Sequence, residues 1–176
     1  HRITRGMVGA ESKDRQVLNL FAYTGSFSVY AAMGGAKRVT TIDLSNTYIQ
    51  WARRNFEINQ LNPNLYEFIV MDVMEWLQAS HKEKYDIIVC DPPTFSNSKK
   101  MDGVFDVQRD HVKMISQCCS LLKVDGKLYF STNFSKFKLR SEELLDYRIK
   151  DLTRATTPFD FEGKLERKCY LIQKSD

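Results

Sequence analysis

One run of sequence governs the architecture expected for this chain: Val17-Leu18-Asn19-Leu20-Phe21-Ala22-Tyr23-Thr24-Gly25-Ser26-Phe27-Ser28-Val29-Tyr30-Ala31-Ala32-Met33-Gly34-Gly35-Ala36. Its short apolar beginning, residues 17–21, is typical of a buried strand. Gly25 can adopt the positive φ of a tight turn and lets a ligand approach the backbone. A helix over 26–33 should follow, with Ser26 as its N-cap and the two glycines at its end. The run therefore predicts a strand, a turn and a helix.

The residues after this helix indicate a nucleoside site. A strand over 38–42 ends at Asp43, and an acid at the tip of the second strand of such a unit receives ribose hydroxyls. A dinucleotide would need the G-x-G-x-x-G pattern for its pyrophosphate, whereas this turn has one glycine. Tyr23, Thr24, Gly25 and Ser26 therefore favour S-adenosylmethionine over NAD or FAD. A strand–helix–strand unit without a ligand stays open on this run alone.

A third strand, predicted over 65–70, adds another acid. Asp72 follows it and should hold the adenine amino group, while the backbone N–H of Val73 faces a ring nitrogen. Asp72 also suits a helix N-cap. The two roles are compatible, since the cap uses one carboxylate oxygen and the ligand the other.

The fourth predicted strand, 85–90, delivers Asp91-Pro92-Pro93-Thr94-Phe95. The two prolines fix φ and have no N–H to donate, so their carbonyls form a rigid arc. A planar base can lie along that arc with Phe95 stacked on its face. Methyl transfer needs little more than a nucleophile held in line with the methyl group. We therefore interpret Asp91, Pro92, Pro93 and Phe95 as the catalytic corner.

The other predicted elements complete an α/β pattern. A helix through about Asn59 should bury Trp51 together with Ala52 and Phe56. Residues 127–131 should form the fifth strand, 141–147 a helix, and 149–153 and 168–173 the last two strands. The segment from Phe95 to Arg109 reads as a polar loop.

Composition fits one α/β domain with a substantial core. The chain has 176 residues, of which 43% are hydrophobic and 27% charged, and no apolar run is long enough to span a membrane. The net charge of +4 is compatible with a polyanionic partner. The four cysteines lack C-x-x-C spacing, which predicts no metal site and fits a reducing, cytoplasmic setting. We expect residues 1–15 to be a lead-in from an upstream region and residues 16–176 to form the domain.

Three motifs carry a resemblance to a known family: Leu18-Asn19-Leu20-Phe21-Ala22-Tyr23-Thr24-Gly25-Ser26, Asp91-Pro92-Pro93-Thr94-Phe95-Ser96-Asn97-Ser98-Lys99-Lys100-Met101 and Phe105-Asp106-Val107-Gln108-Arg109-Asp110-His111. The chain resembles class I S-adenosylmethionine-dependent methyltransferases. More narrowly, it resembles the C-terminal, guanine-N7 methyltransferase domains of bifunctional bacterial 23S ribosomal RNA methyltransferases.

The resemblance has several implications. It implies a Rossmann-like, doubly wound sheet of seven strands in the order 3-2-1-4-5-7-6, with strand 7 antiparallel. It implies S-adenosylmethionine as cofactor and 23S ribosomal RNA as substrate. An upstream THUMP module and an N2-guanine methyltransferase region would belong to the same full-length protein. We include Phe21 and Leu44 in the cofactor site beside Tyr23, Thr24, Gly25, Ser26, Asp43, Asp72, Val73 and Asp91.

Two alternatives that act on or bind RNA stay open, beside a third in which the same pocket serves a small-molecule or protein methyltransferase. Methyltransferases that make 5-methylcytosine in 23S RNA place a catalytic cysteine just after the fifth strand, because carbon-5 of cytosine is not nucleophilic. The corresponding segment here, 128–136, has no cysteine, and guanine N7 has a free lone pair that needs no covalent adduct. The other alternative is a catalytically incomplete RNA-binding module that needs its upstream half.

Basic residues near the predicted site suit RNA. Basic and aromatic residues alternate after the fifth strand, a pattern that suits single-stranded RNA. Arg109 could form a local ion pair or reach into the site. The residues predicted to contact RNA are Lys99, Lys100, Arg109, Lys136, Lys138 and Arg140.

Overall fold

The computed structural model describes residues 1–96, 104–157 and 167–175. The strands are β1 (Gln16–Leu20), β2 (Arg38–Asp43), β3 (Glu67–Val70), β4 (Tyr85–Cys90), β5 (Phe95–Ser96), β6 (Phe105–Asp106), β7 (Leu122–Thr132), β8 (Tyr147–Asp151) and β9 (Lys168–Lys174). The α-helices are α1 (Arg2–Glu11), α2 (Ser26–Met33), α3 (Asn46–Ile58), α4 (Val73–Gln78), α5 (Val107–Ser120) and α6 (Thr153–Thr156). Short 3-10 helices cover Pro63–Leu65 and Ser141–Glu143.

Seven of the strands form one sheet in the order β3-β2-β1-β4-β7-β9-β8. Counted within this sheet alone, the order is 3-2-1-4-5-7-6, so the predicted topology is confirmed. Strands β3, β2, β1, β4 and β7 pair in parallel, whereas β9 is antiparallel to both β7 and β8. Parallel pairing brings the carboxyl ends of β1, β2, β3, β4 and β7 to one edge, where the predicted functional residues follow the strands.

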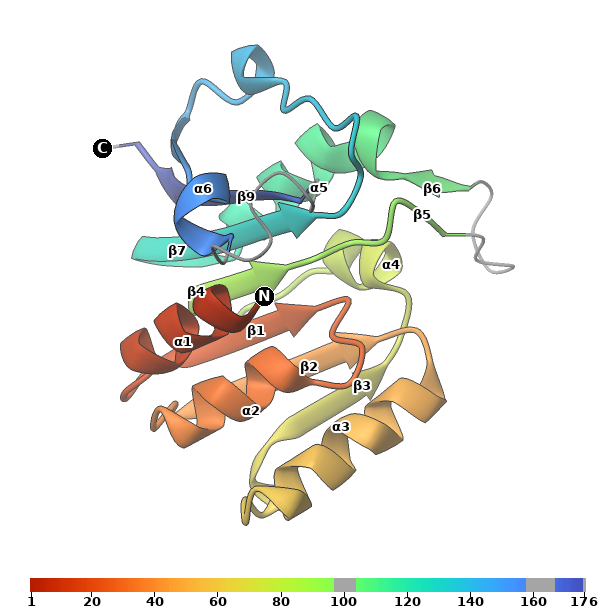
Figure 1. The fold of residues 1–176 in the computed structure, drawn as a ribbon, viewed down its shortest axis with the longest axis vertical. Helices are drawn as coiled ribbons and strands as arrows, with labels where there is room; N and C mark the ends of the chain where they lie inside the picture. Colours follow the sequence, from red (N-terminus) through yellow and green to blue (C-terminus); the bar gives the residue numbers. More distant parts are fainter. Residues whose placement is uncertain (97–103, 158–166, 176) are drawn as a thin grey trace.

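Helices cover both faces of the sheet (Figure 1). On one face, Val17, Val39 and Val89 pack against α1, α2 and α3. On the other, Leu18 and Ile88 pack against α4 and α5. Successive residues of a strand thus bury opposite sides, as expected for a sheet covered on both faces. The core therefore holds the strand tips in fixed relative positions.

The turn between β1 and α2 depends on Gly25. Gly25 is the N-cap of α2 at φ 69°, and no side chain caps the helix. The expected N-cap at Ser26 is therefore wrong, because Ser26 is already the first helical residue. A Cβ on Gly25 would lie 2.6 Å from the Cβ of Ala52 in α3. The sequence suggested that Gly25 leaves room for a ligand. In the structure, the neighbour that leaves no room for a Cβ is helix α3.

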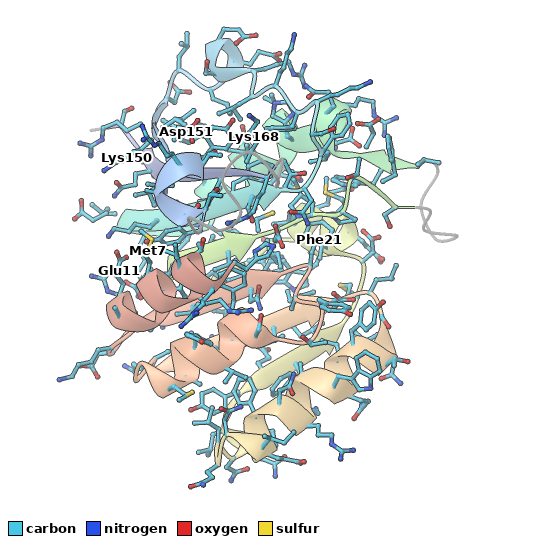
Figure 2. All side chains as sticks on the ribbon, viewed as in Figure 1. Met7, Glu11, Phe21, Lys150, Asp151 and Lys168 are labelled. Carbon is cyan, nitrogen blue, oxygen red and sulfur yellow. The ribbon has the colours of Figure 1, made fainter. Side chains whose placement is uncertain are left out.

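Residues expected as a lead-in form a packed helix. A Cβ on Gly34, at the end of α2, would lie 2.0 Å from the backbone oxygen of Gly9, so α1 and α2 touch through glycines. Figure 2 shows Met7 and Glu11 one turn apart on α1. Met7 packs against the core, and Glu11 forms a 2.9 Å ion pair with Lys127 of β7. Helix α1 thus covers the same face of the sheet as α2 and α3.

Several local predictions were wrong. Trp51 is 48% exposed, while Ala52 and Phe56 of the same helix are buried. Residues 141–147 form one 3-10 turn and then enter β8, where a helix was expected. The expected loop after Phe95 contains the paired strands β5 and β6. Within the described residues, no helix is long and apolar enough to cross a membrane.

Candidate functional site

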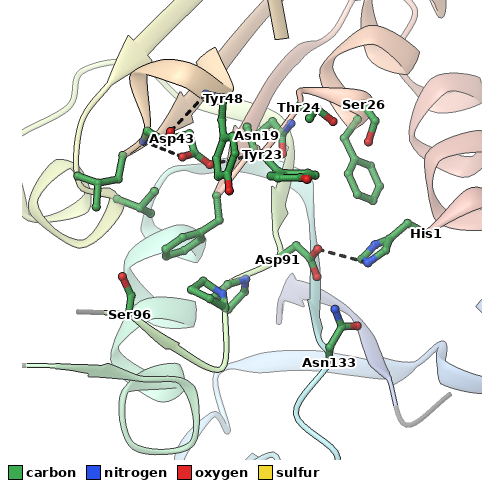
Figure 3. A pocket seen from close by; sticks show the side chains of 18 of the residues that line it. His1, Asn19, Tyr23, Thr24, Ser26, Asp43, Tyr48, Asp91, Ser96 and Asn133 are labelled. Carbon is green, nitrogen blue, oxygen red and sulfur yellow. Dashed lines mark hydrogen bonds and ion pairs between the residues drawn. The ribbon is translucent and has the colours of Figure 1, made fainter. Parts of the chain in front are cut away.

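A cavity of about 730 Å³ opens at the carboxyl edge of the sheet. The tips of β1, β2 and β4, the residue after β7, and the first residues of α1, α2 and α4 contribute to its wall. Figure 3 shows Asp43 on one side of this space, and Asp91 and Asn133 on another. Cavities of this size hold cofactor-sized ligands.

Asp43, the last residue of β2, joins two loops. Its Oδ2 accepts a 2.8 Å hydrogen bond from the Tyr23 N–H, and its Oδ1 accepts a 2.9 Å bond from the Ser45 N–H. Burial raises the pKa of this carboxyl above its usual value, while the two backbone bonds act in the opposite direction. Each carboxylate oxygen keeps a second lone pair, so Asp43 can still accept hydrogen bonds from a ligand.

Asp72 is buried and caps α4. Its Oδ1 accepts bonds from the N–H groups of Met74 and Glu75, at 2.8 and 3.1 Å. Both cap bonds therefore fall on one oxygen, as the sequence predicted. The side chain also lines the cavity, and its Oδ2 is available to a donor such as an exocyclic amino group.

Asp91 lies at the tip of β4, beside the tip of β7. Its Oδ1 accepts a hydrogen bond from the Ser131 hydroxyl, and its Oδ2 lies 3.4 Å from Nε2 of His1 (Figure 3). Burial raises the pKa of Asp91 to about 6, although the Ser131 hydroxyl and nearby positive charge lower it. Asp91 is thus mostly ionised at neutral pH, and in that form it can accept from a cationic or N–H donor in the cavity.

The turn after β1 contains strain that the sequence did not signal. Phe21 and Tyr23 have φ values of 53° and 50°, which are uncommon for bulky residues. The Asn55 side-chain amide donates a 2.9 Å bond to the Thr24 carbonyl, and Asp43 accepts from Tyr23. These contacts hold the turn, and residues 21–24 of it line the cavity. Strained backbone of this kind concentrates at functional sites.

Most of the predicted cofactor residues come together in this cavity. The predicted residues that line it are Phe21, Tyr23, Thr24, Ser26, Asp43, Leu44, Asp72, Val73 and Asp91. Gly25 is not among the lining residues, since it faces α3. Of the predicted catalytic corner, Pro92 and Pro93 line the cavity. Phe95 lies outside the wall and is 57% exposed, with its ring centroid 6.4 Å from that of Phe134.

Sequence reasoning missed several lining residues: His1, Arg5, Asn19, Ala22, Phe27, Ser45, Tyr48, Ser96 and Asn133. One signal was available, because Asn19 is a polar residue inside an apolar strand. Its amide donates a 2.9 Å bond to the Ser28 hydroxyl in the core. His1 and Arg5 had no such signal, since α1 was not expected. Arg5 donates to the Ser26 hydroxyl at 3.4 Å and lies over the ring of Tyr30.

The predicted RNA-contacting residues that the structure describes, which are Arg109, Lys136, Lys138 and Arg140, are not among the residues that line the cavity. Arg109 pairs with Asp110 at 2.7 Å and donates to the Val104 carbonyl, so of its two expected roles the structure shows the local one. Arg140 pairs with Glu143 and donates to the Arg109 carbonyl. Lys136 and Lys138 are exposed. Lys99 and Lys100 lie outside the described residues.

A family model for S-adenosylmethionine-dependent methyltransferases matches residues 1–167. The chain belongs to this family. The Ribosomal RNA large subunit methyltransferases K/L of Shewanella woodyi and Shewanella loihica are 51% and 54% identical to it over 164 residues. These matches cover 92% of this chain and 23% of each relative, so the chain spans about a quarter of their length.

A solved structure of SMU.776, described as a methyltransferase complexed with SAH, is similar to this chain. Its TM-score is 0.80 at 30% identity, with 97% of this chain and 48% of that chain covered. A methyltransferase structure from Streptococcus mutans gives a TM-score of 0.79 at 29% identity, with the same coverage. The cofactor of the family is S-adenosylmethionine, as the turn and the strand tips predicted.

The cavity of this chain suits that cofactor. Figure 3 shows the Asp43 carboxylate on one side of the cavity and Ser26 on another, and the Arg5 guanidinium donates to the Ser26 hydroxyl. Asp72 adds a second carboxylate to the lining. A nucleoside carrying an amino-acid tail presents hydroxyl and amino donors at one end and a carboxylate at the other, which matches this arrangement. Among the described residues, no cluster of histidine, cysteine or acidic side chains is arranged to hold a metal ion.

Proposed function

We propose that this chain transfers a methyl group from S-adenosylmethionine to N7 of a guanine in 23S ribosomal RNA. The observation that carries the proposal is that one cavity contains both the acidic strand tips, Asp43 and Asp72, and the Pro92-Pro93 corner. The names of the relatives, which are ribosomal RNA large subunit methyltransferases, support RNA as the substrate.

In the proposed complex, the acidic strand tips hold adenosine. Asp43 accepts from the ribose hydroxyls while keeping its bonds to Tyr23 and Ser45. Asp72 accepts from the adenine amino group through the oxygen that does not cap α4. Arg5 and Ser26 face the carboxylate of the amino-acid tail, and Asp91 accepts from its ammonium. The cofactor supplies an electrophilic methyl group on a sulfonium.

The base-binding half is formed by the residues after β4. The Pro92 and Pro93 carbonyls form a stiff edge to the cavity, and Phe95 next to it offers an exposed aromatic face. Together they orient a planar base so that one ring nitrogen faces the methyl group. Guanine N7 carries a lone pair, so alignment is the main requirement and a general base is not needed.

Thiol chemistry supports N7 over carbon-5 of cytosine. The cysteines Cys90, Cys118, Cys119 and Cys169 are all fully buried or nearly so, and none lines the cavity. Burial raises the pKa of Cys90 well above its usual value and that of Cys119 to about 12, so these thiols stay protonated. A covalent adduct requires a thiolate within reach of the base.

Nucleoside mass spectrometry tests this proposal. The full-length protein that carries this chain is incubated with unmethylated 23S RNA and isotope-labelled S-adenosylmethionine, and the RNA is digested to nucleosides. The full-length relatives are about four times as long as this chain, so a labelled product could form elsewhere in the protein. The Asp43→Ala variant is therefore the control that assigns a product to this site. We expect labelled 7-methylguanosine that disappears in the variant. Labelled 5-methylcytidine in its place would contradict the proposal.

The alternative of a binding module needing its upstream half makes a different prediction. The isolated chain would then bind 23S RNA but transfer no label, while the full-length protein would transfer it. We also propose that the full-length protein carries the upstream regions. It would act in the cytoplasm and bind 23S RNA.

A further inference from the structure

Asn133 presents a carboxamide at the proposed base-binding side of the cavity. It follows β7 directly, is exposed, and lines the cavity on the same side as Asp91 (Figure 3). The Ser131–Asp91 hydrogen bond ties the tips of β7 and β4 together, so this wall is built from two joined strands. Within the described residues, no hydrogen bond involves the Asn133 side chain, in contrast to Asn19 and Asn55.

The backbone around Asn133 is held in place. The Phe134 N–H donates a 3.2 Å bond to the hydroxyl of Thr132, which is fully buried. The Phe134 ring packs against the core, and its carbonyl accepts from the Phe137 N–H at 3.1 Å. A polar side chain between two fixed neighbours, with no hydrogen-bond partner in the described part of the chain, is well placed to bind a ligand group.

The chemistry of the wall indicates which group it would bind. The prolines have no N–H, and an ionised Asp91 can only accept. Of the described lining residues that follow β4 and β7, Asn133 and Ser96 are therefore the ones whose side chains can donate. His1, which also lines the cavity, comes from the start of α1 and lies against Asp91. Guanine carries its O6 acceptor next to N7 on the same edge. A donor at O6 therefore fixes the direction in which N7 points.

We propose that Asn133 is a positioning residue that donates a hydrogen bond from its amide to O6 of the substrate guanine. This inference rests on the proposed function and extends it to the edge of the base that the protein reads. The carboxamide orients N7 toward the methyl group, and it takes no part in bond making or breaking.

The test compares two substitutions at this position in the full-length protein. Asn133→Ala removes the donor and should lower kcat/KM for 23S RNA about tenfold. Asn133→Asp keeps the shape but offers only acceptors, so its carboxylate repels O6 and the loss should be larger still. Affinity for S-adenosylmethionine, measured by calorimetry, should stay unchanged in both variants. Ser135→Asp is the matched control, since it adds the same charge at an exposed position outside the cavity wall.

Each other outcome overturns the inference. If Asn133→Ala keeps full activity, the carboxamide does not position the base. If Asn133→Asp is as active as the wild type or more active than Asn133→Ala, residue 133 accepts hydrogen bonds from the N–H groups on the Watson–Crick edge of guanine. If Ser135→Asp loses as much activity as Asn133→Asp, the effect is one of charge on RNA binding. A wild-type protein that forms no 7-methylguanosine would instead refute the proposed function itself.

Discussion

Asp43 holds the turn after β1 through Tyr23 and the start of α3 through Ser45. The same carboxylate faces the cavity, so its structural bonds fix the orientation in which it would meet ribose hydroxyls. Hydrogen bonds to a charged acceptor contribute about 1.5–3 kcal/mol each. Asp43 is therefore the side chain on which cofactor affinity should depend most strongly.

Asp43→Ala should weaken S-adenosylmethionine binding by about a hundredfold or more, because two charge-assisted bonds are lost. Titration calorimetry measures this directly. Asp86→Ala is the matched control, since Asp86 also accepts from a backbone N–H, that of Gln16, but lies at the start of β4, at the opposite edge of the sheet. Equal affinities in the wild type and Asp43→Ala would refute the ribose role.

Phe95→Ala should lower methyl transfer to RNA by about tenfold, because base–aromatic stacking contributes about 1–3 kcal/mol per base. Cofactor affinity should not change, since Phe95 lies outside the cavity wall. Single-turnover rates and calorimetry on the same preparation separate the two effects. A parallel loss of rate and cofactor affinity would count against stacking on the base.

Asp91 should make the fold less stable as pH rises. Its pKa is about 6 in the folded chain, against 3.8 for an unperturbed carboxyl, so between these values the folded state keeps a proton that the unfolded state has lost. The free energy of unfolding therefore falls as pH increases through this window, and the full cost is present above it. The rise in pKa from 3.8 to about 6 corresponds to a loss of at most about 3 kcal/mol in the free energy of unfolding. This is an upper bound, because 24% of the Asp91 side chain is accessible to solvent, which screens the charge.

Asp91→Asn should accordingly stabilise the chain more at about pH 8 than at about pH 4, since asparagine keeps an acceptor for Ser131 but cannot ionise. Urea unfolding of both proteins at the two pH values measures this. Other titrating acids are common to both proteins, so their contributions cancel in the comparison. A stability difference that does not vary with pH would show that the Asp91 carboxyl is not destabilised by burial.

At the scale of elements, the β1–turn–α2 unit depends on one backbone conformation. Gly25 combines a positive φ with a close approach to Ala52. Gly25→Ala should lower the free energy of unfolding by about 2 kcal/mol or more, because the left-handed backbone alone costs an L-residue about 1–2 kcal/mol. Thermal or urea unfolding measures the change.

Gly6→Ala is the control for Gly25→Ala. Gly6 lies within α1 and has nothing within 4 Å of an added Cβ, so alanine there should stabilise the helix by up to about 1 kcal/mol. If the two variants had the same stability, the turn would not require glycine.

The elements that could be predicted from sequence were those with a strong local pattern. The strands 17–21, 38–42 and 85–90 are short apolar runs with polar ends, and the structure has β1, β2 and β4 at these places. Helix α1 could not be found this way, because its contacts with α2 and β7 involve residues distant in sequence. Trp51 lies at helical spacing beside buried residues, yet its side chain faces outward along α3.

At the scale of the whole molecule, the site could be predicted because the order and direction of the strands place their carboxyl ends at one edge of the sheet. Parallel strands place Asp43, Asp72 and Asp91 at one edge, so those residues could be chosen from the sequence. Residues that enter the cavity from other elements, such as Arg5 from α1 and Asn133 after β7, could not be chosen. Their positions depend on how helices and strand ends pack together, which no local pattern reports.

The central claim is that one cavity at the strand tips holds the cofactor in a defined orientation. A crystal structure of the chain with S-adenosylhomocysteine tests it most directly. We predict ribose hydroxyls within hydrogen-bonding distance of the Asp43 carboxylate, the adenine amino group at Asp72, and the amino-acid carboxylate near Arg5. A ligand bound elsewhere, or one lying in the cavity without contact to Asp43 and Asp72, would contradict the account.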